Sequence, residues 1–132
     1  MSGSKGFLDT NIVIDIFSGK NSIVEQADKL SKFYINSIVL GELYIGINRV
    51  ANRAKHLKKL NDFLELCTVL DVDAETAEIF GRIVAELHKK GKPIPTNDVW
   101  IAASVKQHDL LLITNDKHFK NVNGLPLKHW NQ

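Results

Sequence analysis

A chain of 132 residues with 44% hydrophobic and 24% charged residues has the size and composition of one soluble globular domain, here residues 1–132. Its net charge of +2 is too small to establish nucleic-acid binding. Cys67 is the single cysteine, which excludes an internal disulfide and favours a cytoplasmic location; such a cysteine is more often a small core residue than a nucleophile. No apolar run approaches the ~18 residues of a membrane span, and residues 1–5 contain no apolar signal segment, so no membrane partner is expected.

The first half of the chain alternates strand and helix signals. Ser37 is a predicted N-cap, and Ile23, Ala27 and Leu30 are predicted to face inward from their helix. In chain order we expect a strand over 5–8, a helix beginning at 12–17, a helix over 22–32, a strand over 33–36, a helix over 37–48, a helix over roughly 52–66 and a strand over 68–72.

The second half continues the alternation. Asp73 is a predicted N-cap of a long helix that ends at Lys89-Lys90-Gly91, with a buried stripe of Ala77, Phe80, Val84 and Leu87. Thr96 or Asn97 is expected to cap a helix that runs through Gln107, residues 110–113 a central strand, and residues 126–130 an edge strand. The pattern predicts a three-layer α/β fold whose mostly parallel central sheet is flanked by helices.

Four acidic residues interrupt segments that are otherwise uncharged and mostly apolar. They are Asp9, Glu42, Asp98 and Asp116. Asp9 and Asp116 directly follow predicted strands, and Glu42 and Asp98 belong to helices whose starts can lie at the same edge of the sheet. Ligands of open parallel sheets bind at the carboxyl ends of the strands, so the four carboxylates are candidates for one site.

A structural alternative exists for three of the four acids. Asp9, Asp98 and Asp116 lie at expected helix starts, and taken singly each is better explained as a cap of backbone N–H groups. Glu42 has no such explanation, because it lies about a turn into its helix with Ile38, Ile45 and Gly46 at helical spacing. A carboxylate in apolar company is costly unless a positive charge meets it there.

A shared divalent cation would offset the repulsion between four converging carboxylates. Hard oxygen ligands suit Mg²⁺ or Mn²⁺ better than Zn²⁺, and such ions assist reactions at phosphate. The histidines lack the spacing of a metal site, so none is assigned as a ligand or a general base: His56, His88, His108, His118 and His129.

Four segments together resemble the successive motifs of PIN domains, most closely those of VapC-type toxins of prokaryotic toxin–antitoxin pairs. No single motif is specific, but the ordered set is, and with the closing segment 124–130 it covers nearly the whole chain. The segments are Phe7-Leu8-Asp9-Thr10-Asn11, Leu40-Gly41-Glu42-Leu43-Tyr44-Ile45-Gly46, residues 94–103 around Asn97-Asp98, and Ile113-Thr114-Asn115-Asp116.

The resemblance implies a metal-dependent endoribonuclease with a PIN-like fold. Asp9, Glu42, Asp98 and Asp116 would bind Mg²⁺ or Mn²⁺, and an activated water would cut an RNA phosphodiester to leave 5′-phosphate and 3′-hydroxyl ends. Thr114 would be a supporting hydroxyl, and Asn11 would orient Asp9 or a water. The implied partners are RNA, a cognate VapB-like antitoxin that contacts the helices after Glu42, and a second copy of the chain in a homodimer.

Three other interpretations stay open. A PIN-type nuclease that processes RNA without being a toxin would have the same four acids. A phosphatase with an Asp nucleophile is disfavoured, because Asn11 occupies the position of its second Asp. A non-catalytic interaction module, in which the acids only cap helices, predicts no affinity for metal.

Overall fold

The computed structural model describes residues 5–130, so the N-terminal segment discussed above lies, apart from Lys5, outside the described residues. Five strands form one sheet in the order β3-β2-β1-β4-β5, and every neighbouring pair is parallel. The strands are β1 (Lys5–Leu8), β2 (Lys32–Asn36), β3 (Cys67–Leu70), β4 (Leu111–Ile113) and β5 (Leu127–Lys128).

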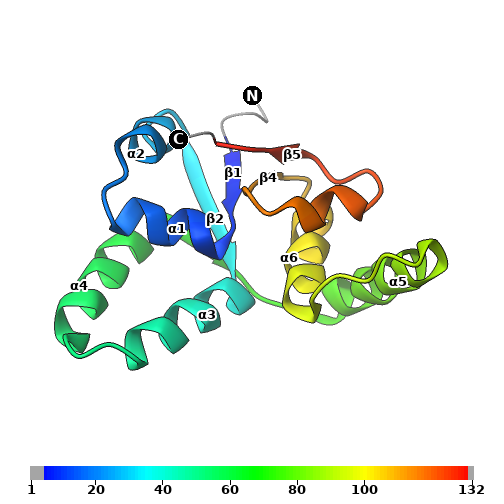
Figure 1. The fold of residues 1–132 in the computed structure, drawn as a ribbon, viewed down its shortest axis with the longest axis horizontal. Coiled ribbons are helices and arrows are strands. Elements are labelled where there is room, and N and C mark those ends of the chain that lie inside the picture. The colour runs from blue at the N-terminus through cyan, green and yellow to red at the C-terminus, as the bar shows by residue number, and fades with distance from the viewer. Residues whose placement is uncertain (1–4, 131–132) are drawn as a thin grey trace.

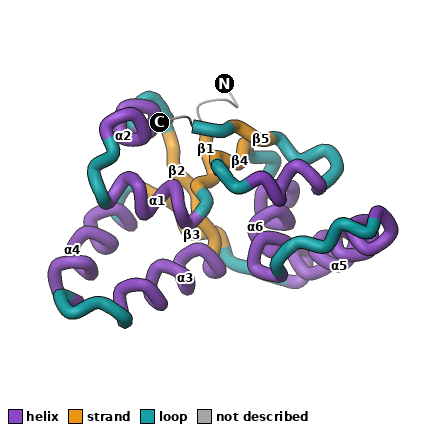
Figure 2. The backbone as a smooth tube through the Cα atoms, viewed as in Figure 1, coloured by secondary structure: helices purple, strands orange, loops and turns teal. Residues whose placement is uncertain are grey.

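Helices cover both faces of the sheet, which confirms the predicted three-layer α/β fold. Figure 1 shows α1, α2 and α4 on one side of the strands and α5 and α6 on the other, with α3 below the sheet between the two groups. The same arrangement is traced in Figure 2. The helices are α1 (Thr10–Phe17), α2 (Asn21–Ala27), α3 (Ser37–Asn48), α4 (Arg53–Leu64), α5 (Ala74–Lys90), α6 (Thr96–Gln107) and the 3-10 helix η2 (Lys117–Asn121).

The middle of the sheet is β1, and its carboxyl end lies beside that of β4. Leu8 is in register with Ile113, and both side chains are completely buried. The next N–H, that of Asp9, donates to the carbonyl of Ile113 at 3.0 Å. The residues that follow β1 and β4, Asp9 and Thr114, are therefore brought together by the pairing of the two strands. The prediction of 110–113 as an interior strand holds, although β1 occupies the centre.

Several helix starts differ from the sequence predictions. Asn36, rather than Ser37, caps α3, because its side chain accepts the N–H of Val39 at 3.0 Å. Pro95 precedes α6 without a side-chain cap, so neither Thr96 nor Asn97 has the expected role. Asp73 does cap α5, in a capping box with Thr76.

The predictions of the buried residues of α5 and of the extent of α2 were also partly wrong. The buried stripe of α5 consists of Thr76, Ile79, Ile83 and Leu87, whereas Ala77 is exposed. The helix expected over 22–32 ends at Ala27, so Leu30 packs against the core from the following turn.

Two negative predictions can be compared with the structure. No helix among residues 5–130 is both long and apolar enough to cross a membrane. Cys67 is half-buried against the core at the start of β3, and burial raises the pKa of its thiol to about 11. The thiol is therefore less acidic than that of an ordinary cysteine, whereas a reactive cysteine typically has a lowered pKa.

Candidate active site

Asp9 is the buried centre of the site. It is 6% exposed and lies directly after β1, where it is the N-cap of α1. Its Oδ1 accepts the N–H of Thr10 at 2.8 Å, and its Oδ2 accepts the hydroxyl of Thr114 at 2.7 Å. The capping interpretation is thus correct for Asp9, but it accounts for only one of the two carboxylate oxygens.

Glu42 reaches the same region from the second turn of α3. The hydroxyl of Thr10 donates to Glu42 Oε1 at 2.6 Å, which joins the start of α1 to the middle of α3. Thr10 therefore contacts two of the predicted acids, one through its backbone N–H and one through its side chain. Thr10 was not among the predicted site residues, and its place between Asp9 and Asn11 was the available signal.

The start of α3 is fixed against α6 by Asn36, which is completely buried. While its Oδ1 caps α3, its Nδ2 donates to Ser104 Oγ at 2.9 Å and to the carbonyl of Trp100 at 3.4 Å. One amide side chain thus sets the position of the helix that carries Glu42 relative to the helix that carries Asp98.

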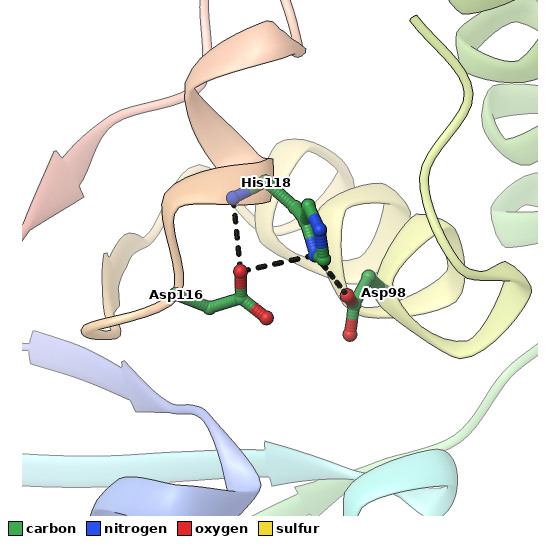
Figure 3. A group of neighbouring side chains, drawn as sticks. All are labelled: Asp98, Asp116 and His118. Carbon is green, nitrogen blue, oxygen red and sulfur yellow. Dashed lines mark hydrogen bonds and ion pairs between the residues drawn. The ribbon is translucent and has the colours of Figure 1, made fainter.

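Asp98 and Asp116 lie close together with a third group, His118 (Figure 3). Asp98 is in the first turn of α6, and Asp116 follows β4 as the N-cap of η2. His118 Nδ1 lies 3.1 Å from Asp116 Oδ1 and 3.7 Å from Asp98 Oδ2, and one ligand-type atom from each of the three residues lies within 4.8 Å of the others. This proximity could not be predicted from the spacing of the residues along the chain, because Asp98 and His118 come from separate elements.

Thr114 connects the two halves of the site. Its hydroxyl gives its one proton to Asp9 and accepts the backbone N–H of Asp116 at 3.0 Å. The adjacent Asn115 is anchored to the end of the described chain, since its side chain accepts the N–H of Trp130 and donates to the Trp130 carbonyl, both at 3.0 Å. The loop after β4 is therefore held from both sides.

The carboxylates influence each other electrostatically. Burial raises the pKa of Asp9, the hydrogen bonds from Thr114 and Thr10 lower it, and the charges of Asp116 and Glu42 raise it further. For Asp98, burial and then the charges of Asp9, Asp116 and Glu42 raise the pKa to about 6, against a smaller opposing effect of His118. All four predicted acids therefore occupy one electrostatic neighbourhood.

The donor set fits a hard divalent cation. All four acids offer carboxylate oxygens, and within residues 5–130 no lysine or arginine forms an ion pair with any of them. Repulsion between carboxylates that no lysine or arginine offsets is the condition that a bound Mg²⁺ or Mn²⁺ relieves.

Asn11 does not make one of the two contacts expected of it, because it does not orient Asp9, while its other expected role, to orient a water, stays a prediction. Its side chain is exposed, and in the described part of the chain Thr10 and Thr114, rather than Asn11, donate to the oxygens of Asp9. The hydroxyl expected of Thr114, by contrast, is completely buried beside Asp9.

Comparison with known proteins bears on the family of the chain. The family model described as PIN domain matches residues 6–125. Ribonuclease VapC2 of Haemophilus influenzae is 35% identical over 129 residues, which span 96% of this chain and 98% of that protein. The tRNA(fMet)-specific endonuclease VapC of Shigella flexneri is 33% identical over the same length and coverage.

A solved structure gives the same result for the fold. VapBC2 from Rickettsia felis, bound to a DNA fragment from its promoter, contains a chain that matches with a TM-score of 0.90 and 30% identity, over 96% of this chain and 99% of that one. Family model, sequence relatives and three-dimensional likeness thus span nearly the same residues. The chain belongs to the PIN domain family.

Proposed function

We propose that this chain is a metal-dependent endoribonuclease that acts as the toxin of a VapBC-type toxin–antitoxin pair. The observation that carries the proposal is the meeting of Asp9, Glu42, Asp98 and Asp116 at one edge of a parallel sheet, with no lysine or arginine of residues 5–130 paired to them. Relatives of the same length are named ribonucleases, which supports RNA as the substrate. Cleavage in the cytoplasm by a single domain is part of the proposal.

In this proposal the four carboxylates hold one or two Mg²⁺ or Mn²⁺ ions. When bound, such an ion supplies Lewis-acid chemistry, which polarises a phosphoryl oxygen, activates water and stabilises a leaving oxyanion. Hydrolysis with departure of the 3′ oxygen leaves 5′-phosphate and 3′-hydroxyl ends on the RNA.

The protein's own contribution is to hold the carboxylates in place before the ligand arrives. Thr114 and the Thr10 N–H fix both oxygens of Asp9, and the Thr10 hydroxyl fixes Glu42. Asn36 holds the helices of Glu42 and Asp98 together. Groups that are oriented in advance need little rearrangement when the substrate binds, which lowers the barrier to reaction.

The proposed antitoxin partner has an apolar surface beside the site on which to bind. A groove of about 260 Å³ between α1, α3 and α4 includes Glu42 in its lining together with Phe17 and Ile47. Ile14 and Val50, which also line it, are 44% and 41% exposed. A VapB-like segment that fills this groove would reach Glu42 and block the site. The exposed Tyr44 and Ile45 on α3 are candidates for the homodimer interface.

Calorimetric titration of Mg²⁺ and Mn²⁺ tests the metal site directly. We expect the parent protein to bind both ions and Glu42→Gln to bind them at least about tenfold more weakly, because a ligand charge is lost. Glu65→Gln, an exposed residue that follows α4, is the matched control and should bind like the parent. The titration is repeated with a non-cleavable RNA analogue present. Absence of binding by the parent under both conditions would contradict the proposal and favour the interaction module.

A further inference from the structure

His118 enters the site at the point where two of the proposed ligands meet. Figure 3 shows its imidazole ring beside the carboxylates of Asp98 and Asp116, with Nδ1 as the atom that faces both. The distances from Nδ1 are 3.1 Å to Asp116 Oδ1 and 3.7 Å to Asp98 Oδ2. The ring comes from η2, whereas Asp98 comes from α6, so the contact is not a local consequence of chain spacing.

These distances match the separations between ligand atoms around a single ion. Two ligands bonded at about 2.1 Å and at right angles lie about 3.0 Å apart, and opposite ligands lie about 4.2 Å apart. The nitrogen and the nearest oxygens of Asp98 and Asp116 all lie within 4.8 Å of one another. Only small side-chain adjustments separate the three atoms from common coordination.

The backbone of His118 is held in place beside the two carboxylates. The N–H of His118 donates to Asp116 Oδ1 at 2.9 Å, and the next residue, Phe119, is completely buried. The side chain of His118 is 54% exposed, so the ring can turn toward an ion without disturbing the core. The backbone of His118 is anchored and its ring is accessible, and both properties suit a side chain that binds an ion at the edge of a site.

We infer that His118 is a nitrogen ligand of the proposed metal site and makes that site prefer Mn²⁺ over Mg²⁺. The inference rests on the proposed function and adds a residue outside its four carboxylates. Imidazole nitrogen is a good ligand for transition metals, whereas Mg²⁺ takes oxygen ligands and keeps its waters. To bind the ion, Nδ1 presents its lone pair and the proton of the neutral ring is on Nε2.

The simplest rival is that His118 acts only as a cation paired with the two carboxylates. The two interpretations predict different results when the ring is removed. If His118 is a ligand, its removal lowers the affinity for Mn²⁺ and changes the affinity for Mg²⁺ little. Removal of a competing cation raises the affinity for both ions alike where imidazole is protonated, and leaves the ratio of the two affinities unchanged where imidazole is neutral.

The test is titration of Mn²⁺ and of Mg²⁺ into the full chain and into His118→Asn and His118→Ala, at a pH where imidazole is neutral. Asn places an oxygen near the position of Nδ1, so it replaces a nitrogen ligand by a hard one. His108→Asn is the control, because His108 is exposed and lies at the opposite end of α6 from Asp98. All four proteins are measured as full-length chains.

We expect both His118 variants to lose about tenfold or more of the ratio of Mn²⁺ to Mg²⁺ affinity, with the control unchanged. A ratio equal to that of the parent, or a parallel rise in affinity for both ions, would overturn the inference while leaving the carboxylate site intact. Absence of binding of either ion by the parent, both without and with the non-cleavable RNA analogue, would contradict the proposed function itself. With Zn²⁺ as a diamagnetic probe, a change in the ¹⁵N shift of His118 Nδ1 should report coordination directly, and an unchanged shift would count against it.

Discussion

The hydroxyl of Thr114 donates to Asp9 Oδ2 at 2.7 Å between two side chains that are almost wholly buried. These residues follow β4 and β1, the paired strands whose carboxyl ends form the edge of the site. The same hydroxyl accepts the N–H of Asp116. A single oxygen atom thus sets the orientation of one proposed ligand and the backbone position of another.

Replacing Thr114 by Val should destabilise the protein by about 1–3 kcal/mol, because the shape is kept while a buried carboxylate loses its donor and a backbone N–H loses its acceptor. Thermal unfolding monitored by circular dichroism measures the loss. Thr114→Ser keeps the hydroxyl and should retain most of the stability. Equal stability of the Val and Ser variants would show that the hydroxyl contributes nothing.

Asp98 should make the stability of the metal-free protein depend on pH. Its pKa is about 6 in the folded chain against an ordinary value of 3.8, so the folded state binds the proton more tightly. By linkage, the contribution of protonated Asp98 to the free energy of unfolding is fully present below pH 3.8 and is lost as the pH rises through about 6. After allowance for the partial exposure of Asp98, the loss should be about 1–2 kcal/mol.

Chemical denaturation in the presence of a chelator, at a series of pH values, measures this effect. Asp98→Asn should be more stable than the parent near neutral pH and should show a flatter dependence between about pH 4 and about pH 6. A parent curve that rises with pH across this interval, or a variant with an unchanged slope, would contradict the assignment of Asp98 to the repelling cluster.

Thr10→Val should weaken metal binding without changing the fold, since Glu42 loses the hydroxyl that orients its Oε1. Loss of a group that orients a metal ligand typically costs about tenfold or more in affinity. Thr10→Ser should bind like the parent, because it keeps the hydroxyl, and the backbone N–H to Asp9 is present in both variants. Equal metal affinities of the Thr10→Val and Thr10→Ser variants would show that the Thr10 hydroxyl does not support metal binding.

Much of the architecture could be predicted because it depends on local pattern. Apolar runs marked the strands, and their alternation with helices implied parallel pairing. The four acids were found because each is an isolated charge at the end of a strand or within an apolar helix. In the structure, Asp9 and Asp116 are indeed helix caps, yet they also share one electrostatic neighbourhood with Glu42 and Asp98.

What could not be predicted depends on packing between distant segments. Asn36 and Ser104 are 68 positions apart, and only the docking of α3 against α6 explains why Asn36, not Ser37, caps the helix. On α5 the prediction holds for Phe80, Val84 and Leu87, which lie in the core or pack against it. It fails at Ala77, because Thr76 is the buried residue of the first turn and contacts Gln107. His118 was considered and given no ligand role because its spacing along the chain is not that of a metal site, and its closeness to Asp98 depends, like the contacts of Asn36, on the meeting of two separate elements.

The four carboxylates are proposed to form the catalytic centre of a metal-dependent ribonuclease. The most direct measurement is cleavage of RNA by the parent, by Asp9→Asn and by the exposed control Asp28→Asn, each with Mn²⁺ or Mg²⁺ and with a chelator. We predict cleavage by the parent and the control that the chelator abolishes, and none by Asp9→Asn, which should unfold at the same or a higher temperature because carboxylate repulsion is relieved. Undiminished metal-dependent cleavage by Asp9→Asn would contradict the claim.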